Sequence, residues 1–438
     1  MQLTRYFHIF TFILTRYFHN QALQIKRYIK QELIDHLPKK EILLLTGARQ
    51  VGKTTILLEI IQDLKNKGEK VLFLNLDNDA HSPFFESQEK LLKKAALELG
   101  NSGYIFIDEI QRKENAGIFL KGIYDRNLPY KLIITGSGSL ELKEKIHESL
   151  SGRKRAFEMM PVTFMEFADY KTNYRYAEEL VAFLEMHPSE YETLLNEYLN
   201  YGGYPRIVTE PKSNEKLQLI DEIFSSYVEK DIVYLLKIER PEVFKMLIQI
   251  LASQTAQLIN YSSLSTQLGL SVPTLKKYLW YAEKTFSLQR ITPYYSNRTK
   301  EITKAPVYYF TDIGLRNFAI GVMGNLIDNN QKGFVFQNLV HQLLKEYISG
   351  TGWTLHYWRT TDKAEVDFII DKKSQVLPVE VKFGTIKQLT ISRSFRSFIE
   401  KYNPVEAWLV NPTKLAETKI NNTTVRFLPF YQISQFTP

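Results

Sequence analysis

The sequence predicts an α/β fold, in which a parallel sheet with helices on both faces is followed by a helical region and a second α/β region. Three features of the sequence predict this arrangement. Short apolar runs alternate with segments of helical spacing in the first part of the chain, a glycine-containing loop joins one run to a helix, and a strand hairpin lies near the carboxyl end. The length of 438 residues is enough for about three domains.

The composition is that of a folded protein, with 44% hydrophobic residues. The 56 Lys and Arg residues outnumber the 48 Asp and Glu residues, and the net charge of +8 permits contact with nucleic acid without requiring it. The chain has no cysteine, which excludes disulfides, thiolate zinc sites and cysteine nucleophiles. This is compatible with a reducing cytoplasm, the location that we expect.

Residues 1–22 are expected to form an extension of unknown use. The hexapeptide at 3–8 recurs unchanged at 14–19, and the apolar run at 9–13 between the copies is too short to span a bilayer. The segment also lacks the small-residue cleavage site of a secretory signal. Since no other apolar run approaches the length of a membrane-spanning helix, we expect no membrane contact.

The loop at 47–55 fits the pattern G-x-x-x-x-G-K-[ST] at every fixed position, and its residues are Gly47, Ala48, Arg49, Gln50, Val51, Gly52, Lys53, Thr54 and Thr55. An apolar run at 42–45 precedes it and helical spacing follows it, which is the order that a phosphate-binding loop requires. Backbone N–H groups and the helix start attract phosphate there. We therefore expect ATP at this loop, with Lys53 on the β- and γ-phosphates and the Thr54 hydroxyl on Mg²⁺.

A second apolar run, at 104–107, ends in two acids, Asp108 and Glu109. In phosphate-loop ATPases a strand-terminal Asp holds the Mg²⁺ ion, and we assign that role to Asp108. The neighbouring Glu109 is then placed to activate or orient the attacking water, which makes it the expected catalytic base.

Two further runs complete the predicted sheet, one at 70–76 and one at 130–134, and helices are expected at 24–37 and 89–99. Thr135 and Ser137 follow the last run, so they are candidates to sense the γ-phosphate. The alternative is a simple Gly-Ser turn.

On these residues the sequence resembles the AAA-type ATPases of bacteria and archaea, in one uncharacterised family. The resemblance rests on the segments 47–55, 105–111 and 133–137, and it continues through 150–153 and 161–167. It implies that Arg153 stabilises phosphate charge in its own site or in that of a neighbouring subunit of a homo-oligomer. The alternative is a surface arginine within a basic cluster.

The middle of the chain divides into two predicted modules. Residues 166–236 are expected to form a helical lid beside the nucleotide, with a Gly-Gly-Tyr-Pro break that the family shares. Residues 237–329 are typical of a winged helix, with helices at 241–254, 262–268 and 271–284 and strands at 286–294 and 307–310. In DNA-binding versions the third helix enters the major groove, so Lys276 and Lys277 are candidates to contact duplex DNA. Such folds also serve as packing modules.

The carboxyl-terminal region carries a second chemical pattern. A strand at 364–370 contains Asp367, and after a turn the strand at 376–382 carries Glu380 and Lys382 on one face. This hairpin resembles the PD-(D/E)XK nucleases of the restriction-endonuclease-like fold, in which the Asp and Glu bind Mg²⁺ and the Lys positions or polarises water. Gln337 stands where the first helix of that superfamily often supplies Glu, and a neutral amide binds hard cations less strongly. We expect Asp367, Glu380 and Lys382 to converge on one face, whether or not they cut DNA. The alternative is an inactive nuclease-like fold used for recognition, in which Glu380 pairs with Lys382.

These features predict five parts: an extension (1–22), a P-loop AAA-type ATPase domain (23–165), a helical lid (166–236), a winged helix (237–329) and a nuclease-like domain (330–438). The expected function is binding and hydrolysis of ATP with Mg²⁺, coupled to the last two modules. Two alternatives remain open: an ATP-regulated DNA endonuclease, and an ATP-dependent signalling switch that cuts no nucleic acid.

Overall fold

The computed structural model describes residues 24–136, 149–227, 232, 238, 240–285, 287–295, 305–326 and 329–436. The expected extension at 1–22 and the candidate Ser137 lie outside these residues. None of the helices in the described ranges is both long enough and apolar enough to cross a bilayer.

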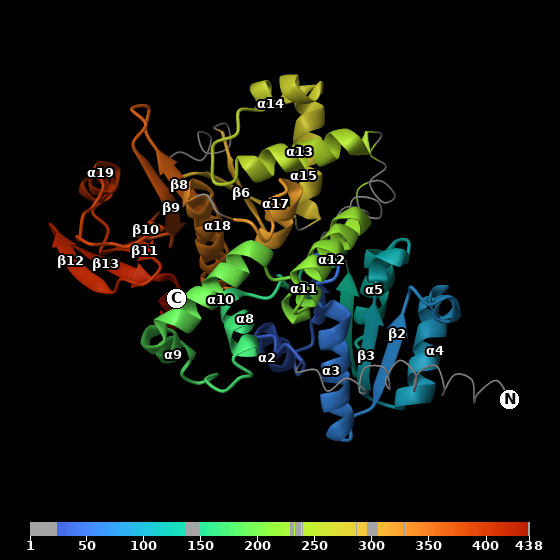
Figure 1. Ribbon diagram of the computed structural model, residues 1–438. Helices are drawn as coiled ribbons and strands as arrows, with labels where there is room; N and C mark the ends of the chain where they lie inside the picture. Colours follow the sequence, from blue (N-terminus) through green and yellow to red (C-terminus); the bar gives the residue numbers. More distant parts are fainter. Residues whose placement is uncertain are drawn as a thin grey trace.

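The first part of the chain forms a five-stranded sheet in the order β2-β3-β4-β1-β5, with every neighbouring pair parallel (Figure 1). The prediction of a parallel α/β sheet is therefore confirmed. Its strands are β1 (Ile42–Thr46), β2 (Val71–Asn75), β3 (Gly103–Asp108), β4 (Tyr130–Gly136) and β5 (Lys154–Glu158). Strand β5 was not expected from the sequence, because it is an edge strand whose residues are largely exposed and polar, so no apolar run marks it.

Helices cover both faces of this sheet. Helices α2 (Ile29–His36) and α3 (Lys53–Asn66) share a core with Leu43 and Leu45, whereas α4 (Gln88–Leu99) and α5 (Ala116–Tyr124) share one with Leu44. Alternate strand residues thus face opposite helix layers. The helix expected at 24–37 is shorter, because it begins only at Ile29.

A helical region follows the sheet, between residues 164 and 226. Its helices are α8 (Phe164–Lys171), α9 (Leu180–Met186), α10 (Pro188–Tyr201), α11 (Pro205–Thr209) and α12 (Ser213–Ser226). Helix α8 begins at a capping box, in which Thr163 and Glu166 satisfy each other's backbone N–H groups. Gly202 and Pro205 separate α10 from α11, because Gly202 has a φ of 72° and Pro205 starts the next helix.

Three helices and a hairpin come next: α13 (Pro241–Ser253), α14 (Tyr261–Leu268), α15 (Val272–Lys284), β6 (Leu288–Pro293) and β7 (Val307–Phe310). Gly269 ends α14 with a φ of 60°, and the Ser271 hydroxyl accepts the backbone N–H of Thr274 at the start of α15. A further helix, α17 (Ile313–Ala319), was not predicted. It is only seven residues long and mostly buried, so it shows no amphipathic period.

The last part of the chain forms an eight-stranded mixed sheet in the order β12-β13-β11-β10-β9-β8-β6-β7. Its other elements are α18 (Asn329–Tyr347), β8 (Thr354–Arg359), β9 (Glu365–Asp371), β10 (Val376–Val381), α19 (Arg393–Tyr402), β11 (Glu406–Asn411), β12 (Ala416–Ile420) and β13 (Thr423–Pro429). Strand β6 pairs in parallel with β8, so the sheet continues across the boundary expected at residue 330. Helices α18 and α19 pack in separate cores that take alternate residues of β9, one on each face of the sheet (Figure 1).

Candidate functional site

The loop between β1 and α3 has the conformation that its glycines permit. Gly47 and Gly52 have φ values of 151° and 100°, and a Cβ atom at Gly47 would lie 2.4 Å from the carbonyl oxygen of Met159. Lys53, which is 6% exposed, donates from Nζ to the carbonyl oxygens of Gly47 at 3.0 Å and Ala48 at 2.6 Å. The ammonium group is therefore held over the loop, next to the first turn of α3.

The carboxylate of Asp108 accepts hydrogen bonds from side chains of three other elements. It is fully buried at the end of β3, and its Oδ2 atom accepts from the Thr54 hydroxyl at 2.8 Å and from Asn75 Nδ2 at 3.1 Å. Its Oδ1 atom accepts from the Thr135 hydroxyl. Because β2, β3 and β4 are parallel neighbours, their carboxyl ends meet at the edge where the loop begins. Thr54, Asp108 and Thr135 thus form one cluster.

Glu109 directly follows this cluster in a left-handed backbone conformation, with a φ of 58°. Its backbone N–H donates to the Thr135 hydroxyl at 3.2 Å, and the Gln111 side chain donates to Glu109 Oε2. Burial raises the pKa of the Glu109 carboxyl, Lys53 opposes the rise, and Asp108 adds to it. A carboxyl whose pKa is raised holds a proton more readily, which is the property that a base near neutral pH needs.

Three polar residues near the loop were missed in the sequence. Asn75 ends β2 opposite Asp108 in the sheet register, and an Asn at a strand end was the signal that could have found it. Arg206, just after the Gly-Gly-Tyr-Pro segment, donates to the Gln50 side chain at 3.4 Å and to Glu222 at 3.1 Å. Arg27 donates to the carbonyl oxygen of Val51 at 2.9 Å. No sequence pattern links Arg27 to the loop.

The expectation that Arg153 reaches phosphate in its own site is wrong for the geometry of this chain. The carbonyl oxygen of Arg153 accepts the N–H of Ile42 at the amino end of β1, whereas the phosphate loop follows the carboxyl end of that strand. The Arg153 side chain pairs with Asp125 at 2.7 Å. A basic cluster in the sequence does not reveal at which end of a strand it will lie.

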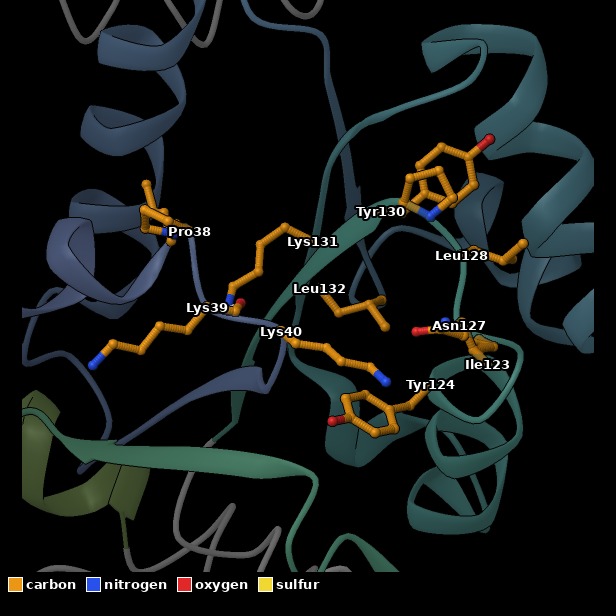
Figure 2. A pocket seen from close by; sticks show the side chains of 12 residues that line it. Pro38, Lys39, Lys40, Ile123, Tyr124, Asn127, Leu128, Tyr130, Lys131 and Leu132 are labelled. Carbon is orange, nitrogen blue, oxygen red and sulfur yellow. The ribbon is translucent and has the colours of Figure 1, made fainter.

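A cavity of about 260 Å³ lies at the same amino edge, between the segment before β1 and the segment before β4. Figure 2 shows Lys40 beside Tyr124 in this cavity, with the ammonium 5.1 Å from the ring centroid. Lys131 also lines it, but its Nζ atom donates to the carbonyl oxygens of His36, Lys39 and Glu41. The cavity is thus separate from the phosphate loop, and its buried cation is already satisfied by backbone.

The carboxyl-terminal candidates lie at the end of the β9–β10 pairing. The register runs from Val376↔Asp371 to Val379↔Phe368, and Asp367 and Glu380 are the next residues of the two strands beyond it. Asp367 accepts from Gln337 Nε2 at 3.2 Å and from the backbone N–H of Val381 at 2.7 Å. Burial raises the pKa of Asp367 to about 7, and the nearby Glu380 carboxylate adds to the rise.

Glu380 has partners of its own. It is 4% exposed, its Oε1 atom lies 2.7 Å from Lys382 Nζ, and its Oε2 atom accepts from the Ser392 hydroxyl at 2.8 Å. Ser392 caps α19 on one face of the sheet, whereas Gln337 belongs to α18 on the other. Glu380 is therefore paired with Lys382, whereas Asp367 accepts a hydrogen bond from Gln337 of α18, on the other face of the sheet.

The two places differ in how well they suit a Mg²⁺ ion. Within the described residues, no group of three or more His, Cys, Asp or Glu side chains is arranged to hold a metal ion. Mg²⁺ commonly takes one or two protein oxygens together with waters and phosphate oxygens, and the Thr54 hydroxyl with the Asp108 carboxylate fits that requirement. The C-terminal place offers Asp367, a Glu380 already paired with Lys382, and the amide of Gln337, which fits less well.

Comparison with protein families divides the chain into three matched segments. Residues 39–168 match a family described as an AAA domain, whereas residues 192–325 and 332–433 each match a domain of unknown function. The first match covers the loop, β3 with Asp108 and β4 with Thr135. Residues 39–168 therefore form an AAA-type ATPase domain.

Two relatives that match most of the chain are both described as uncharacterized proteins. The chain is 27% identical over 365 residues to an uncharacterized protein of Haemophilus influenzae, covering 81% of this chain and 85% of that one. It is 27% identical over 349 residues to an uncharacterized protein of Methanocaldococcus jannaschii, covering 78% and 75%.

Among solved structures, the Orc1 protein of Aeropyrum pernix in complex with DNA has a TM-score of 0.28 and 11% identity, over 68% of this chain and 94% of that one. DnaA of Aquifex aeolicus bound to AMPPCP has a TM-score of 0.26 and 15% identity, over 60% and 92%. Scores at this level support no statement about the function of this chain.

Proposed function

We propose that this chain binds ATP with Mg²⁺ at residues 47–55 and hydrolyses it. The observation that carries the proposal is the contact between the Thr54 hydroxyl and the buried Asp108 carboxylate at 2.8 Å, beside the ammonium of Lys53. In this proposal Lys53 binds the β- and γ-phosphates, and Thr54 and Asp108 hold Mg²⁺. The metal neutralises charge on the phosphate oxygens when it is bound.

The remaining residues of the cluster are proposed to act on water. Glu109 accepts a proton from the attacking water, and Thr135, which contacts both Asp108 and the Glu109 backbone, holds the two acids in register. Arg206 supplies a second positive charge from the helical lid, opposite Gln50. Arg153 remains a proposal only for a neighbouring subunit of a homo-oligomer, since it lies at the far edge of its own sheet.

The ATPase is proposed to be coupled to the modules that follow it. The core that contains Leu43 and Leu45 of β1 and the helix α3 also contains residues of α12, α13 and α15. Because these side chains are packed together, a change in the position of the loop or of α3 would displace helices of the proposed winged helix. This supports an ATP-dependent switch as the general form of the activity.

A DNA-contacting surface is a second candidate function. Helix α15 presents Lys276, Lys277 and Trp280 to solvent, and Trp280 is 44% exposed. Ammonium groups bind phosphate, and exposed aromatic rings stack on bases. An electrophoretic shift with duplex DNA that is lost when both lysines become Glu supports this candidate, and no shift at low salt rejects it.

An ATP-regulated endonuclease is the third candidate, and it rests on Asp367, Glu380 and Lys382. Cleavage of plasmid DNA with Mg²⁺ or Mn²⁺, abolished in Lys382→Ala, supports it. Without cleavage, the signalling switch that cuts no nucleic acid is favoured.

The main proposal is tested by phosphate release from Mg·ATP. We expect the full chain to release phosphate and Lys53→Ala to release none above background, because the charge next to the transferred phosphate is lost. Turnover in Lys53→Ala at the rate of the natural chain contradicts the proposal.

A further inference from the structure

One segment connects the phosphate loop to the helical lid through close contacts. It spans residues 159–162, directly after β5. The backbone N–H of Met159 donates to Thr46 at 2.8 Å, and the carbonyl oxygen of Met159 lies against Gly47, where a Cβ atom would be only 2.4 Å away. Arg27 donates to the carbonyl oxygen of Met160 at 2.6 Å as well as to that of Val51 in the loop. The start of the loop thus contacts this segment directly, and Arg27 links Val51 of the loop to it.

The far end of the segment meets the Gly-Gly-Tyr-Pro break. Val162 donates its N–H to the carbonyl oxygen of Gly203 at 2.7 Å, and its own carbonyl oxygen accepts from the Tyr198 hydroxyl at 2.9 Å. A Cβ atom at Gly203 would lie 2.1 Å from that same carbonyl oxygen. Any side chain at this position would clash with the carbonyl oxygen, so only glycine permits so close an approach.

Asp312 holds the opposite side of the same break. It is 1% exposed, its Oδ2 atom accepts the backbone N–H of Gly203 at 2.7 Å, and its Oδ1 atom accepts that of Leu315 at 2.8 Å. A Cβ atom at Gly314 would lie 2.1 Å from the carbonyl oxygen of Tyr201. One buried carboxylate therefore ties the break to the start of α17, a segment more than 100 positions later in the chain.

Arg206 comes three residues after Gly203, in the first turn of α11. The chain between them is stiff, because Pro205 fixes its own φ and begins the helix. The position of Gly203 therefore sets where α11 begins. The exposed Arg206 side chain pairs with Glu222 at 3.1 Å and contacts Gln50 in the phosphate loop at 3.4 Å.

We propose that Asp312 is a positioning residue for ATP hydrolysis, which acts through Gly203 to place Arg206 against the phosphate loop. The inference rests on the proposed ATPase function and adds a residue outside the AAA-type domain at 39–168. Asp312 also caps α17, so the same contact links the nucleotide site to the module that contains β6 and β7.

The test compares kcat/KM for ATP in four forms of the full chain: the natural chain, Asp312→Asn, Arg206→Ala and the double variant. An Asn has one acceptor oxygen in place of two, so at least one of the backbone N–H groups of Gly203, Gly314 and Leu315 loses its partner. We expect a roughly tenfold loss in each single variant, because displaced positioning groups cost about this much or more. If Asp312 acts through Arg206, the loss of kcat/KM in the double variant is no greater than the larger of the two single losses.

A milder pair of variants keeps the test decisive if Asp312→Asn does not fold, as judged by circular dichroism. Tyr198→Phe removes only the hydroxyl that fixes Val162, and it is expected to lower kcat/KM and to show the same non-additivity with Arg206→Ala. Tyr191→Phe is the matched control, because Tyr191 lies on the same helix and its hydroxyl donates to Pro412 at 2.7 Å, away from the break. It should leave kcat/KM unchanged.

The outcomes separate the two proposals. If the natural chain does not hydrolyse ATP, the proposed function fails and this inference fails with it. If the natural chain hydrolyses ATP but the losses of Asp312→Asn and Arg206→Ala multiply in the double variant, only the inference is overturned. Wild-type kcat/KM in folded Asp312→Asn overturns it as well.

Discussion

The phosphate loop and the C-terminal hairpin contain similar groups, a buried carboxylate near a lysine, but they use them differently. At the loop, Lys53 contacts backbone carbonyls, and Asp108 is surrounded by hydroxyl and amide donors. At the hairpin, Lys382 contacts Glu380 itself, and Asp367 is held by Gln337 and a backbone N–H. The lysine of the hairpin is thus bonded directly to a carboxylate, whereas Lys53 donates to two backbone carbonyl oxygens of the loop.

The partners of the two lysines differ, and the identity of the residues alone does not show this. A lysine that is bonded to weakly basic carbonyls can exchange them for phosphate oxygens at little cost, because charge-assisted bonds are stronger than neutral ones. A lysine that is paired with a carboxylate must lose that partner first, and a buried carboxylate left alone is costly. We therefore expect ligand binding at the loop and a mainly structural role at the hairpin.

The largest expected effect is at Glu109. Glu109→Gln should lower the rate of ATP hydrolysis roughly hundredfold or more, because proton transfer to a positioned base is worth that much, while ATP still binds. Phosphate release and nucleotide binding are measured on the same preparation. Since burial raises the pKa of Glu109, the rate in the natural chain should fall on acidification at a higher pH than the ordinary value of 4.5 would give. An unchanged rate in Glu109→Gln means that another residue orients the water.

The next effect is at Asp108. Asp108→Asn keeps the shape and one acceptor oxygen but removes the charge, so the Mg²⁺ concentration that supports half-maximal hydrolysis should rise about tenfold or more. A Mg²⁺ titration at fixed ATP measures it. Asn75→Ala is the matched comparison, because it removes a donor to the same carboxylate without removing a metal ligand, and it should shift the titration less.

At the hairpin, Gln337→Glu places a third carboxylate beside Asp367 and Glu380. Without metal it should lower the melting temperature, because two acids would meet in a partly buried place where the pKa of Asp367 is already raised to about 7. Millimolar Mn²⁺ should recover the loss by binding the folded chain. Gln337→Ala, which adds no charge, should show no such recovery. Equal stability of Gln337→Glu and the natural chain, with or without metal, contradicts this account of the hairpin.

A smaller effect is expected in the pH dependence of stability. The folded-state pKa of Asp367, about 7, lies above its ordinary value of 3.8, so the folded chain binds this proton more tightly than the unfolded chain does. The contribution of Asp367 to stability therefore falls as pH rises from about 4 to about 7, and it is level above that window. Asp367→Asn should flatten the change in melting temperature over this range, whereas Asp371→Asn, in the same strand, should not. A slope unchanged in Asp367→Asn contradicts the assignment.

Much of the fold was visible in the sequence, because buried parallel strands are continuous apolar runs. The strands β1 to β4 were expected for this reason, and the antiparallel strands β9 and β10 were expected from the apolar runs on either side of a turn. Strand β5 and helix α17 were not, since one is polar and exposed and the other is too short to show a period. The parallel pairing of β6 with β8 could not be predicted either, because pairing between strands distant in the sequence leaves no local pattern.

The phosphate-loop candidates were predictable because a single motif fixes the residues and their neighbours in space. Thr54, Asp108 and Thr135 come together as expected, for the ends of parallel strands share one edge. Arg206 and Asp312 were missed, since the contact of Arg206 with Gln50 and that of Asp312 with Gly203 join residues far apart in the sequence. Arg153 was misplaced because a sequence does not show which end of its strand a basic cluster will occupy.

We expect nucleotide to bind at the phosphate loop, and we expect this binding not to depend on Lys382 of the hairpin. Isothermal titration of a non-hydrolysable ATP analogue with Mg²⁺ into the full chain, Lys53→Ala and Lys382→Ala tests it directly. We predict one site per chain, binding at least about tenfold weaker in Lys53→Ala because a charge-assisted contact is lost, and unchanged affinity in Lys382→Ala. Affinity retained in Lys53→Ala, or lost in Lys382→Ala, would contradict the account.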